Sequence, residues 1–256
     1  MERKVENEGM PVVRLGRELK YEGNILKMYE DTVLANGHEA KRDFIHHDGA
    51  AAVLPVADDG KILMVRQYRN ALNRFTLEIP AGKLDAPDEP KVECAFRELE
   101  EETGFRVESK EKLEYLMSLT TTVAFCDEAI DIFVAHNLIP SHQHLDEDEV
   151  INVVPCELAE LEEMIYTGKI TDGKTIAAVM AYARKNRRFS FRQLLERQAD
   201  KLEVVVTFLA VLELMKMGKI HLTQEHLFDD MNIETLEPEG EQGELDLKEL
   251  EVDMQQ

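Results

Sequence analysis

Short stretches in which hydrophobic and polar residues alternate dominate the first part of the chain, and they predict antiparallel strands. The dipeptide Asn36-Gly37 is a strong hairpin signal, and residues 58–60 mark a second turn. The opening of the chain is therefore expected to be a series of short strands joined by tight turns. The predicted strands are residues 25–34, 39–45 and 50–56, and residues 61–67 after the second turn.

The pattern then changes from that of strands to that of a helix. Glu89 and Pro90 can begin this helix, and Gly104 is a natural stop because glycine readily takes the left-handed conformation at a helix end. Ala95 and Leu99 give the helix an apolar side. A helix between Glu89 and Gly104 is therefore predicted.

Three glutamates of this helix carry its chemistry. Glu98, Glu101 and Glu102 stand at positions i, i+3 and i+4, so their carboxylates converge on one face. Such like charges repel by a few tenths of a kcal/mol per pair on an exposed helix, and a bound cation removes that cost. Carboxylate oxygens suit Mg²⁺ or Mn²⁺. The alternative reading is a charged helix face that only meets solvent.

Further strands and helices follow in an order that divides the chain into parts. Two strands are expected next, at residues 113–122 and 129–135, and two helices after them, at residues 158–166 and 168–178. A basic joint at 183–189 separates them from an apolar helix at 204–217, which Gly218 closes. A short helix at 191–196 and a two-stranded wing, with strands at 220–224 and 227–233, complete a small winged-helix module. We therefore expect domains at 1–185 and 186–235, followed by an acidic, disordered tail at 236–256.

Composition narrows the possible functions. The 256 residues carry a formal net charge of -22, which excludes broad binding to nucleic acid or to anionic lipid. No apolar run approaches the roughly 20 residues that span a bilayer, and the first residues lack a signal-peptide core. The three cysteines show no zinc or disulfide spacing. A cytoplasmic protein in a reducing compartment fits these features, and Cys94 is expected to be a packing residue.

The loop and helix together form a specific motif. The chain reads Gly82, a leading acid, a spacer, and then R-E-L-E-E-E-T-G-F from Arg97 to Phe105. This order resembles the Nudix box, G-x5-E-x7-R-E-U-x-E-E-x-G-U, in which U is apolar. Six residues instead of five separate Gly82 from Glu89, and either Asp88 or Glu89 could be the leading acid, although the spacing to Arg97 favours Glu89. The resemblance implies a Nudix hydrolase with an α/β/α sandwich, in the α+β class.

Two further segments resemble one branch of that family. Residues 66–69 read R-Q-Y-R and residues 78–82 read E-I-P-A-G, as in the ADP-ribose pyrophosphatases, and the likeness extends over about residues 15–185. It implies that Arg66 or Arg69 meets the pyrophosphate and that Glu78 contacts the adenine or a ribose hydroxyl. Surface salt bridges are the alternative for the arginines. The branch also uses extra N-terminal antiparallel strands to build a homodimer.

The same resemblance assigns the metal site and the base. It implies that the backbone carbonyl of Ala81 completes a metal set with the three glutamates, Glu98, Glu101 and Glu102. Arg97 would orient these ligands by pairing with Glu89 or a neighbouring acid. The acid run L-D-E-D-E resembles the family's mobile loop, so Glu147 or Glu149 would act as the base or bind a metal. The His142 and His144 pair is taken as part of a surface loop.

The branch implies Mg²⁺-dependent hydrolysis of ADP-ribose, or a related nucleoside diphosphate sugar, to AMP and ribose 5-phosphate. Many relatives carry S-P-G-F where this chain has Thr122-Val123-Ala124-Phe125, so the contacts to the sugar stay open.

The C-terminal part resembles a different family. Over residues 189–235 it is similar to the C-terminal winged-helix domain of the bacterial kleisin called segregation and condensation protein A. That likeness implies an alternative function in chromosome partition, in which the module binds the head of an SMC protein. The other parts of the kleisin have no counterpart here. A buried helix at 204–217 that packs on the first domain or across a dimer is the plain alternative.

Overall fold

The computed structural model describes residues 11–145, 149–186, 188–190, 201–224 and 231–236. Clustering of the chain gives two compact units, Met1–Tyr182 and Ala183–Gln256, and each is described by itself. The long helix α3 (Gly173–Asn186) contains the point of division.

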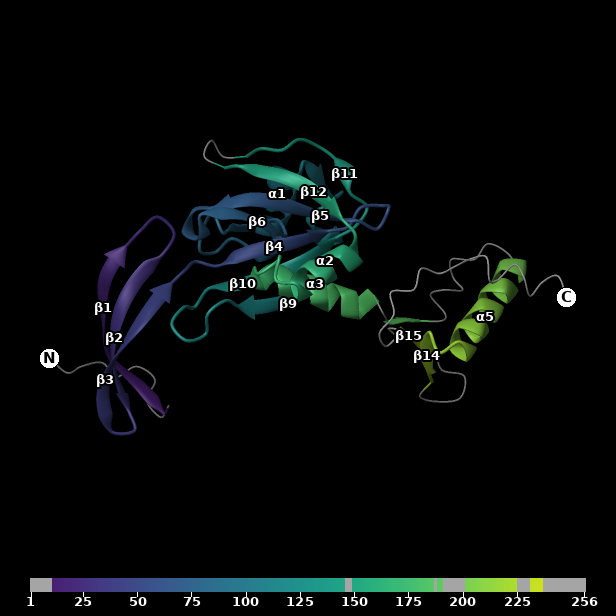
Figure 1. Ribbon diagram of the computed structural model, residues 1–256. Coiled ribbons are helices and arrows are strands. Elements are labelled where there is room, and N and C mark those ends of the chain that lie inside the picture. Colours follow the sequence, from purple (N-terminus) through teal and green to yellow (C-terminus); the bar gives the residue numbers. More distant parts are fainter. Residues whose placement is uncertain (1–10, 146–148, 187, 191–200, 225–230, 237–256) are drawn as a thin grey trace. The chain divides into compact units, whose positions relative to one another are not determined.

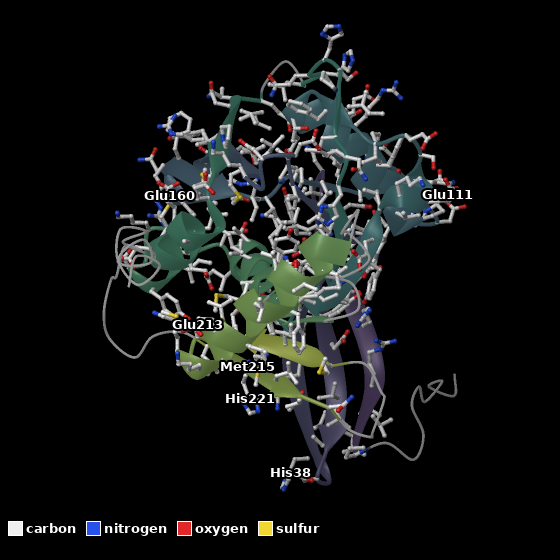
Figure 2. The ribbon with its side chains drawn as sticks, turned by 90° about the vertical axis from the view of Figure 1, so that its right-hand side faces the viewer. His38, Glu111, Glu160, Glu213, Met215 and His221 are labelled. Carbon is white, nitrogen blue, oxygen red and sulfur yellow. The ribbon has the colours of Figure 1, made fainter. Side chains whose placement is uncertain are left out.

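The first unit opens with a three-stranded antiparallel sheet in the order β1-β2-β3. Its strands β1 (Val12–Glu22), β2 (Lys27–Ala35) and β3 (His38–His46) are the long twisted arrows in purple and blue in Figure 1. Asn36 and Gly37 have φ angles of 52° and 77°, the left-handed values that a tight hairpin turn requires. His38 follows this turn, and Figure 2 shows it at the tip of the hairpin. The predicted hairpin is thus confirmed.

Two further sheets form the centre of the first unit. One has the order β7-β4-β10-β9, and its strands β4 and β10 are parallel whereas its other pairs are antiparallel. The other has the order β12-β5-β6 and is antiparallel throughout. The strands are β4 (Ala50–Pro55), β5 (Ile62–Arg69), β6 (Arg74–Glu78), β7 (Ala81–Lys83), β9 (Glu114–Thr120), β10 (Ala129–Ala135) and β12 (Ile151–Cys156). A short antiparallel pair consists of β8 (Phe105–Arg106), which follows α1 (Lys91–Thr103), and β11 (Ile139–Pro140), which follows β10.

Strand β4 is buried on both faces and therefore belongs to two cores. Ala52 and Leu54 pack in the cluster that includes α2 (Leu158–Tyr166) and α3, whereas Ala51 and Val53 pack against α1 (Lys91–Thr103). Figure 1 shows α1 on one side of β4 and α2 with α3 on the other. Because side chains alternate along a strand, the continuous apolar run of β4 can serve both layers. This arrangement is the expected α/β/α sandwich.

The second unit is small. Its described elements are β13 (Arg188–Ser190), α5 (Lys201–Lys216), β14 (Ile220–Thr223) and β15 (Asn232–Thr235). The strands pair antiparallel in the order β13-β15-β14, and Val211 of α5 packs with Ile220 and Ile233 of the sheet. Figure 2 shows Glu213 and Met215 on α5 and His221 on β14. A helix followed by a hairpin is the predicted order.

Several predicted boundaries in this region are wrong. Residues 183–186, expected in a joint, are the last turn of α3, and residues 188–190 of that joint form β13. The described second strand of the wing is β15 at 232–235, which continues past the predicted end at 233, whereas residues 227–230 of the predicted strand lie outside the described residues. The helix predicted at 191–196 and the tail at 237–256 lie outside the described residues. Within the described residues, no helix is both long and apolar enough to cross a membrane.

Candidate functional site

A cavity of about 1100 Å³ collects most of the residues that the motifs singled out. Its walls come from the β7–α1 segment, from β5, from β9 and β10, and from the start of α3. Seven of the ten predicted site residues line it: Arg69, Ala81, Arg97, Glu98, Glu101, Glu102 and Glu149. Residues far apart in the sequence thus meet in one hollow of the first unit.

Helix α1 places the glutamates at this cavity. The helix begins after Pro90 and ends at Gly104, whose φ of 71° and N–H bond to the Glu100 carbonyl form a left-handed cap. Ala95 and Leu99 are fully buried against β4 and fix the rotation of the helix. That rotation turns the three box glutamates toward the cavity, as the i, i+3, i+4 spacing predicted.

Gly82 allows the loop to approach the helix closely. A Cβ atom at this position would lie 1.8 Å from Oε1 of Glu98 and 2.1 Å from its carboxyl carbon. No side chain fits there while Glu98 keeps its place. The glycine of the motif is therefore required by contact with a glutamate and not by an unusual backbone angle.

Arg97 bonds two of the glutamates. Its Nη1 donates to Oε1 of Glu98 at 2.7 Å and to Oε2 of Glu101 at 2.8 Å. Its Nε lies 3.3 Å from Oδ2 of Asp85 and 3.8 Å from Oε1 of Glu89. Arg97 was expected to pair with Glu89 or a neighbouring acid. Its shortest contacts instead go to Glu98 and Glu101.

Burial makes two of these carboxylates weak acids. Burial raises the pKa of Glu102 to about 8, with the charge of Glu98 adding to it and the bond from the Ala81 N–H, at 2.9 Å, opposing it. Burial also raises the pKa of Glu98 to about 7, although Arg97 opposes this shift. Without a bound cation, Glu98 and Glu102 therefore hold their protons up to near-neutral pH, and a cation beside them would favour their ionised forms.

The carboxylate oxygens of Glu98, Glu101 and Glu102, gathered in one cavity lining, are the kind of donor that a divalent cation binds. Hard oxygen ligands from one rigid helix are what Mg²⁺ or Mn²⁺ takes. Across the described residues, however, no three His, Cys, Asp or Glu side chains are already arranged to hold a metal ion. Glu98 and Glu101 face the guanidinium of Arg97, so a metal ion there would compete with Arg97 for their oxygens.

Glu78 lies in a second, charged cluster beside the main cavity. Its side chain is 4% exposed and accepts bonds from Nε and Nη2 of Arg69, at 2.8 and 2.6 Å, and from Oγ1 of Thr76 at 2.6 Å. Lys174 also contacts its carboxylate. Burial alone would raise the pKa of Glu78, but Arg69 and Lys174 overcome it and hold the pKa at about 2.

A smaller cavity of about 350 Å³ adjoins this cluster. Glu78 and Thr76 line the smaller cavity and do not line the larger one, whereas Arg69 and Lys174 line both. Glu78, expected to contact the nucleoside, is thus paired with two cations at the junction of two hollows.

Of the three remaining predicted site residues, Glu78 and Arg66 do not line the main cavity. Arg66 alternates with Gln67 along β5, and its guanidinium carbon lies 3.7 Å from the ring centroid of Phe75, outside the cavity lining. Glu147 lies outside the described residues, whereas Glu149 lines the cavity.

Sequence reasoning missed several residues that line the cavity. His47, Thr121 and Glu128 stand together, with Oγ1 of Thr121 donating to Glu128 at 2.6 Å and His47 Nδ1 3.7 Å from its carboxylate. His47 precedes β4, Thr121 follows β9 and Glu128 precedes β10. Polar residues at such strand ends were the available signal. Lys174 was missed because a lysine in the first turn of a helix carries no motif.

Cys94 has the packing role that was expected. It is fully buried between α1 and β4, and burial raises the pKa of its thiol to about 12. Such a thiol stays protonated and unreactive at neutral pH.

Two family models match the chain. A model of the NUDIX domain matches residues 46–179, and a model of segregation and condensation protein ScpA matches residues 135–236. The ADP-ribose pyrophosphatase of Bacillus subtilis (strain 168) is 39% identical over 168 residues, which are 64% of this chain and 89% of that protein. The methanol dehydrogenase activator of Bacillus methanolicus is 41% identical over 162 residues, 62% of this chain and 85% of that protein.

A solved structure supports the fold. The crystal structure of an ADP compounds hydrolase superposes on this chain with a TM-score of 0.60 and a sequence identity of 21%. The superposition covers 70% of this chain and 95% of the hydrolase chain. At that identity the likeness concerns the fold alone. Both resemblances inferred from the motifs, to the Nudix box and to the kleisin ending, are confirmed. The chain belongs to the Nudix family of hydrolases.

Proposed function

We propose that this Nudix hydrolase cleaves the diphosphate bond of ADP-ribose, or of a related nucleoside diphosphate sugar, to give AMP and ribose 5-phosphate in the presence of Mg²⁺ or Mn²⁺. The observation that carries the proposal is the convergence of Glu98, Glu101 and Glu102 in one large cavity together with Arg69. The ADP-ribose pyrophosphatases of Bacillus subtilis and Mycobacterium tuberculosis, 39% and 32% identical, support the choice of substrate.

The residues of the cavity divide the work by charge. Glu98, Glu101 and Glu102, with the carbonyl of Ala81, would hold the metal, which when bound supplies positive charge to the diphosphate and acidifies a water molecule. Arg97 keeps the carboxylates of Glu98 and Glu101 in position through the bonds described above.

The remaining residues act on the substrate and the water. Arg69 lines the cavity and offers a guanidinium to the diphosphate, and we keep Arg66 as a second candidate for that contact. Glu78 orients Arg69 through its two hydrogen bonds and faces the smaller cavity, where it meets the nucleoside. Glu149, or its neighbour Glu147, takes the proton from the attacking water.

Release of AMP from ADP-ribose with Mg²⁺ tests this function. We expect turnover by the intact chain and a loss of at least about a hundredfold in kcat for Glu101→Gln and for Glu102→Gln, because each removes an anionic ligand. Glu111→Gln is the matched control, since Glu111 lies in an exposed turn outside the cavity lining, as Figure 2 shows. No AMP release from ADP-ribose or from a panel of nucleotide sugars would reject the proposal.

We further propose a cytoplasmic homodimer, with residues 1–185 as the catalytic domain, 186–235 as a winged-helix domain and 236–256 as a tail. The free thiols of Cys94, Cys126 and Cys156 suit a reducing compartment. The sheet β1–β3 carries exposed apolar side chains that a second copy could cover, among them Val12, Leu19, Tyr21 and Leu34.

A second function is supported by the C-terminal unit: binding to the head of an SMC protein. The match to the ScpA model extends to residue 236, and α5 exposes large apolar side chains, including Val205, Phe208, Leu209 and Leu212. Binding of the full chain to a purified SMC head, measured by calorimetry, tests it. We expect Leu209→Glu to abolish binding and Lys216→Gln to leave it unchanged. Equal binding by wild type and Leu209→Glu, or no binding by wild type, would reject this function.

A further inference from the structure

Lys174 is a nearly buried cation that lines both cavities of the first unit. It is the second residue of α3, and its side chain is 10% exposed. Its ammonium contacts the carboxylate of Glu78 and lies 3.0 Å from Oδ2 of Asp172. Burying an ammonium costs free energy, so a position that keeps one at the junction of two hollows calls for an explanation.

Structural pairing does not account for Lys174, because both of its partners are held by other groups. Glu78 accepts two hydrogen bonds from Arg69 and one from Thr76. Asp172 caps α3 and accepts bonds from N–H and Oγ1 of Thr175, at 3.0 and 2.6 Å. Neither carboxylate would be left without a donor if the ammonium of Lys174 moved toward a ligand.

The ammonium also has a donor to spare. It carries three N–H groups, and its hydrogen bonds to the described residues go to Glu78 and Asp172. The third N–H is therefore available to an acceptor in either cavity. A lysine side chain, with its flexible four-carbon stem, can follow such an acceptor over a short distance.

The charges around the main cavity indicate what that acceptor is. Arg97 is occupied by Glu98 and Glu101, so it is not free to meet an anion. Arg69 and Lys174 lie next to each other around Glu78 in the cavity lining, which also includes Lys83 beside α1. Arg69 is close enough to Glu102 for their charges to interact. An anion placed between the α1 glutamates and α3 would meet these two cations.

We propose that Lys174 is a substrate-binding residue that donates a hydrogen bond to an anionic oxygen of the substrate's diphosphate. The inference rests on the proposed function and assigns to α3 a direct part in holding the phosphates. Lys174 and Arg69 both contact the anion, and they differ in how firmly their side chains are held. Arg69 is fixed by its two bonds to Glu78, whereas Lys174 can turn toward the anion while Glu78 keeps its bonds from Arg69 and Thr76.

Steady-state kinetics and product binding test the role of Lys174. We expect Lys174→Met to raise the KM for ADP-ribose at least about tenfold with kcat changed less than threefold, as loss of one charge-assisted hydrogen bond predicts. Lys174→Arg should restore most of the affinity. By calorimetry, the same Lys174→Met change should weaken binding of AMP or of ribose 5-phosphate, and the product affected identifies which phosphate is contacted.

Controls separate this role from a structural one. Lys112→Met removes an exposed lysine outside both cavities and should change neither KM nor binding. An unchanged KM and unchanged binding of both products in Lys174→Met would overturn the inference. The inference would also be overturned if Lys174→Met and Lys174→Arg lost activity and binding to the same extent, and if both losses were explained by a lower melting temperature. A wild-type chain that releases no AMP rejects the proposed function instead, so the two failures are distinguishable.

Discussion

At the scale of single residues, the site depends on close contacts that leave little room for change. Gly82 lies where any Cβ would overlap the carboxylate of Glu98, and Arg97 bonds the same carboxylate from the other direction. The α1 glutamates could be predicted because their spacing is a property of the helix alone. Lys174 and His47 could not, because only the tertiary fold brings the start of α3 and the residues before β4 to the cavity.

The contact at Gly82 leads to a prediction for activity. Gly82→Ala should lower kcat on the order of a hundredfold, since a methyl group at 1.8 Å from Oε1 must displace Glu98. The matched control is Gly16→Ala, because a Cβ there meets nothing within 4 Å. Initial rates of AMP release for the two variants measure the effect. Equal rates would mean that the position of Glu98 is not critical.

At the scale of elements, the predicted bounds agree best with the structure where the local sequence pattern is strongest. Strands β4 and β10 and helices α1 and α2 match their predicted bounds closely because apolar periodicity and end signals coincide there. The end of α3 was mistaken for a joint because Arg184 and Lys185 look like linker residues. Basic side chains also suit the carboxyl end of a helix, and sequence pattern does not separate these two uses. Strand β13 is only three residues long and exists through its pairing with β15.

The junction of β5, β6 and α3 leads to a prediction for stability against pH. The contacts with Arg69 and Lys174 lower the pKa of Glu78 to about 2, below its ordinary value of 4.5. Ionised Glu78 therefore stabilises the fold above about pH 4.5, and this contribution of at most about 3 kcal/mol is lost as the pH falls toward 2. Urea unfolding at pH 7, 5 and 3.5 should show a smaller loss of stability on acidification for Glu78→Gln than for wild type. Parallel losses in both proteins would contradict this.

At the scale of the whole molecule, the exposed apolar side chains of the β1–β3 sheet matter most. This sheet contributes no residue to the two cores of the first unit, and its Leu19 and Tyr21 are 47% and 60% accessible. Packing within the described part of the chain does not explain these exposed apolar side chains. A second copy of the chain would give that sheet a partner. The sequence predicted the strands themselves, but pattern alone does not specify what covers them.

The homodimer can be tested by sedimentation. Wild type should sediment at twice the mass of one chain, and Leu19→Glu should shift the equilibrium to the single chain because it places a charge on the apolar face. Lys20→Gln is the control on the neighbouring position, where the side chain pairs with Glu18 and Glu30. A wild-type protein that stays a single chain at high concentration would reject the dimer.

Helix α3 has a practical consequence for anyone who wishes to separate the two parts of this protein. Its first turn supplies Lys174 and Gly173 to the cavity, and its last residues, Ala183 to Asn186, already belong to the second unit. A gene fragment that stops at the unit boundary, after Tyr182, would therefore end inside a helix and lose its final turn. A catalytic fragment designed for expression should extend at least to Asn186, so that the helix carrying one wall of the cavity keeps its full length.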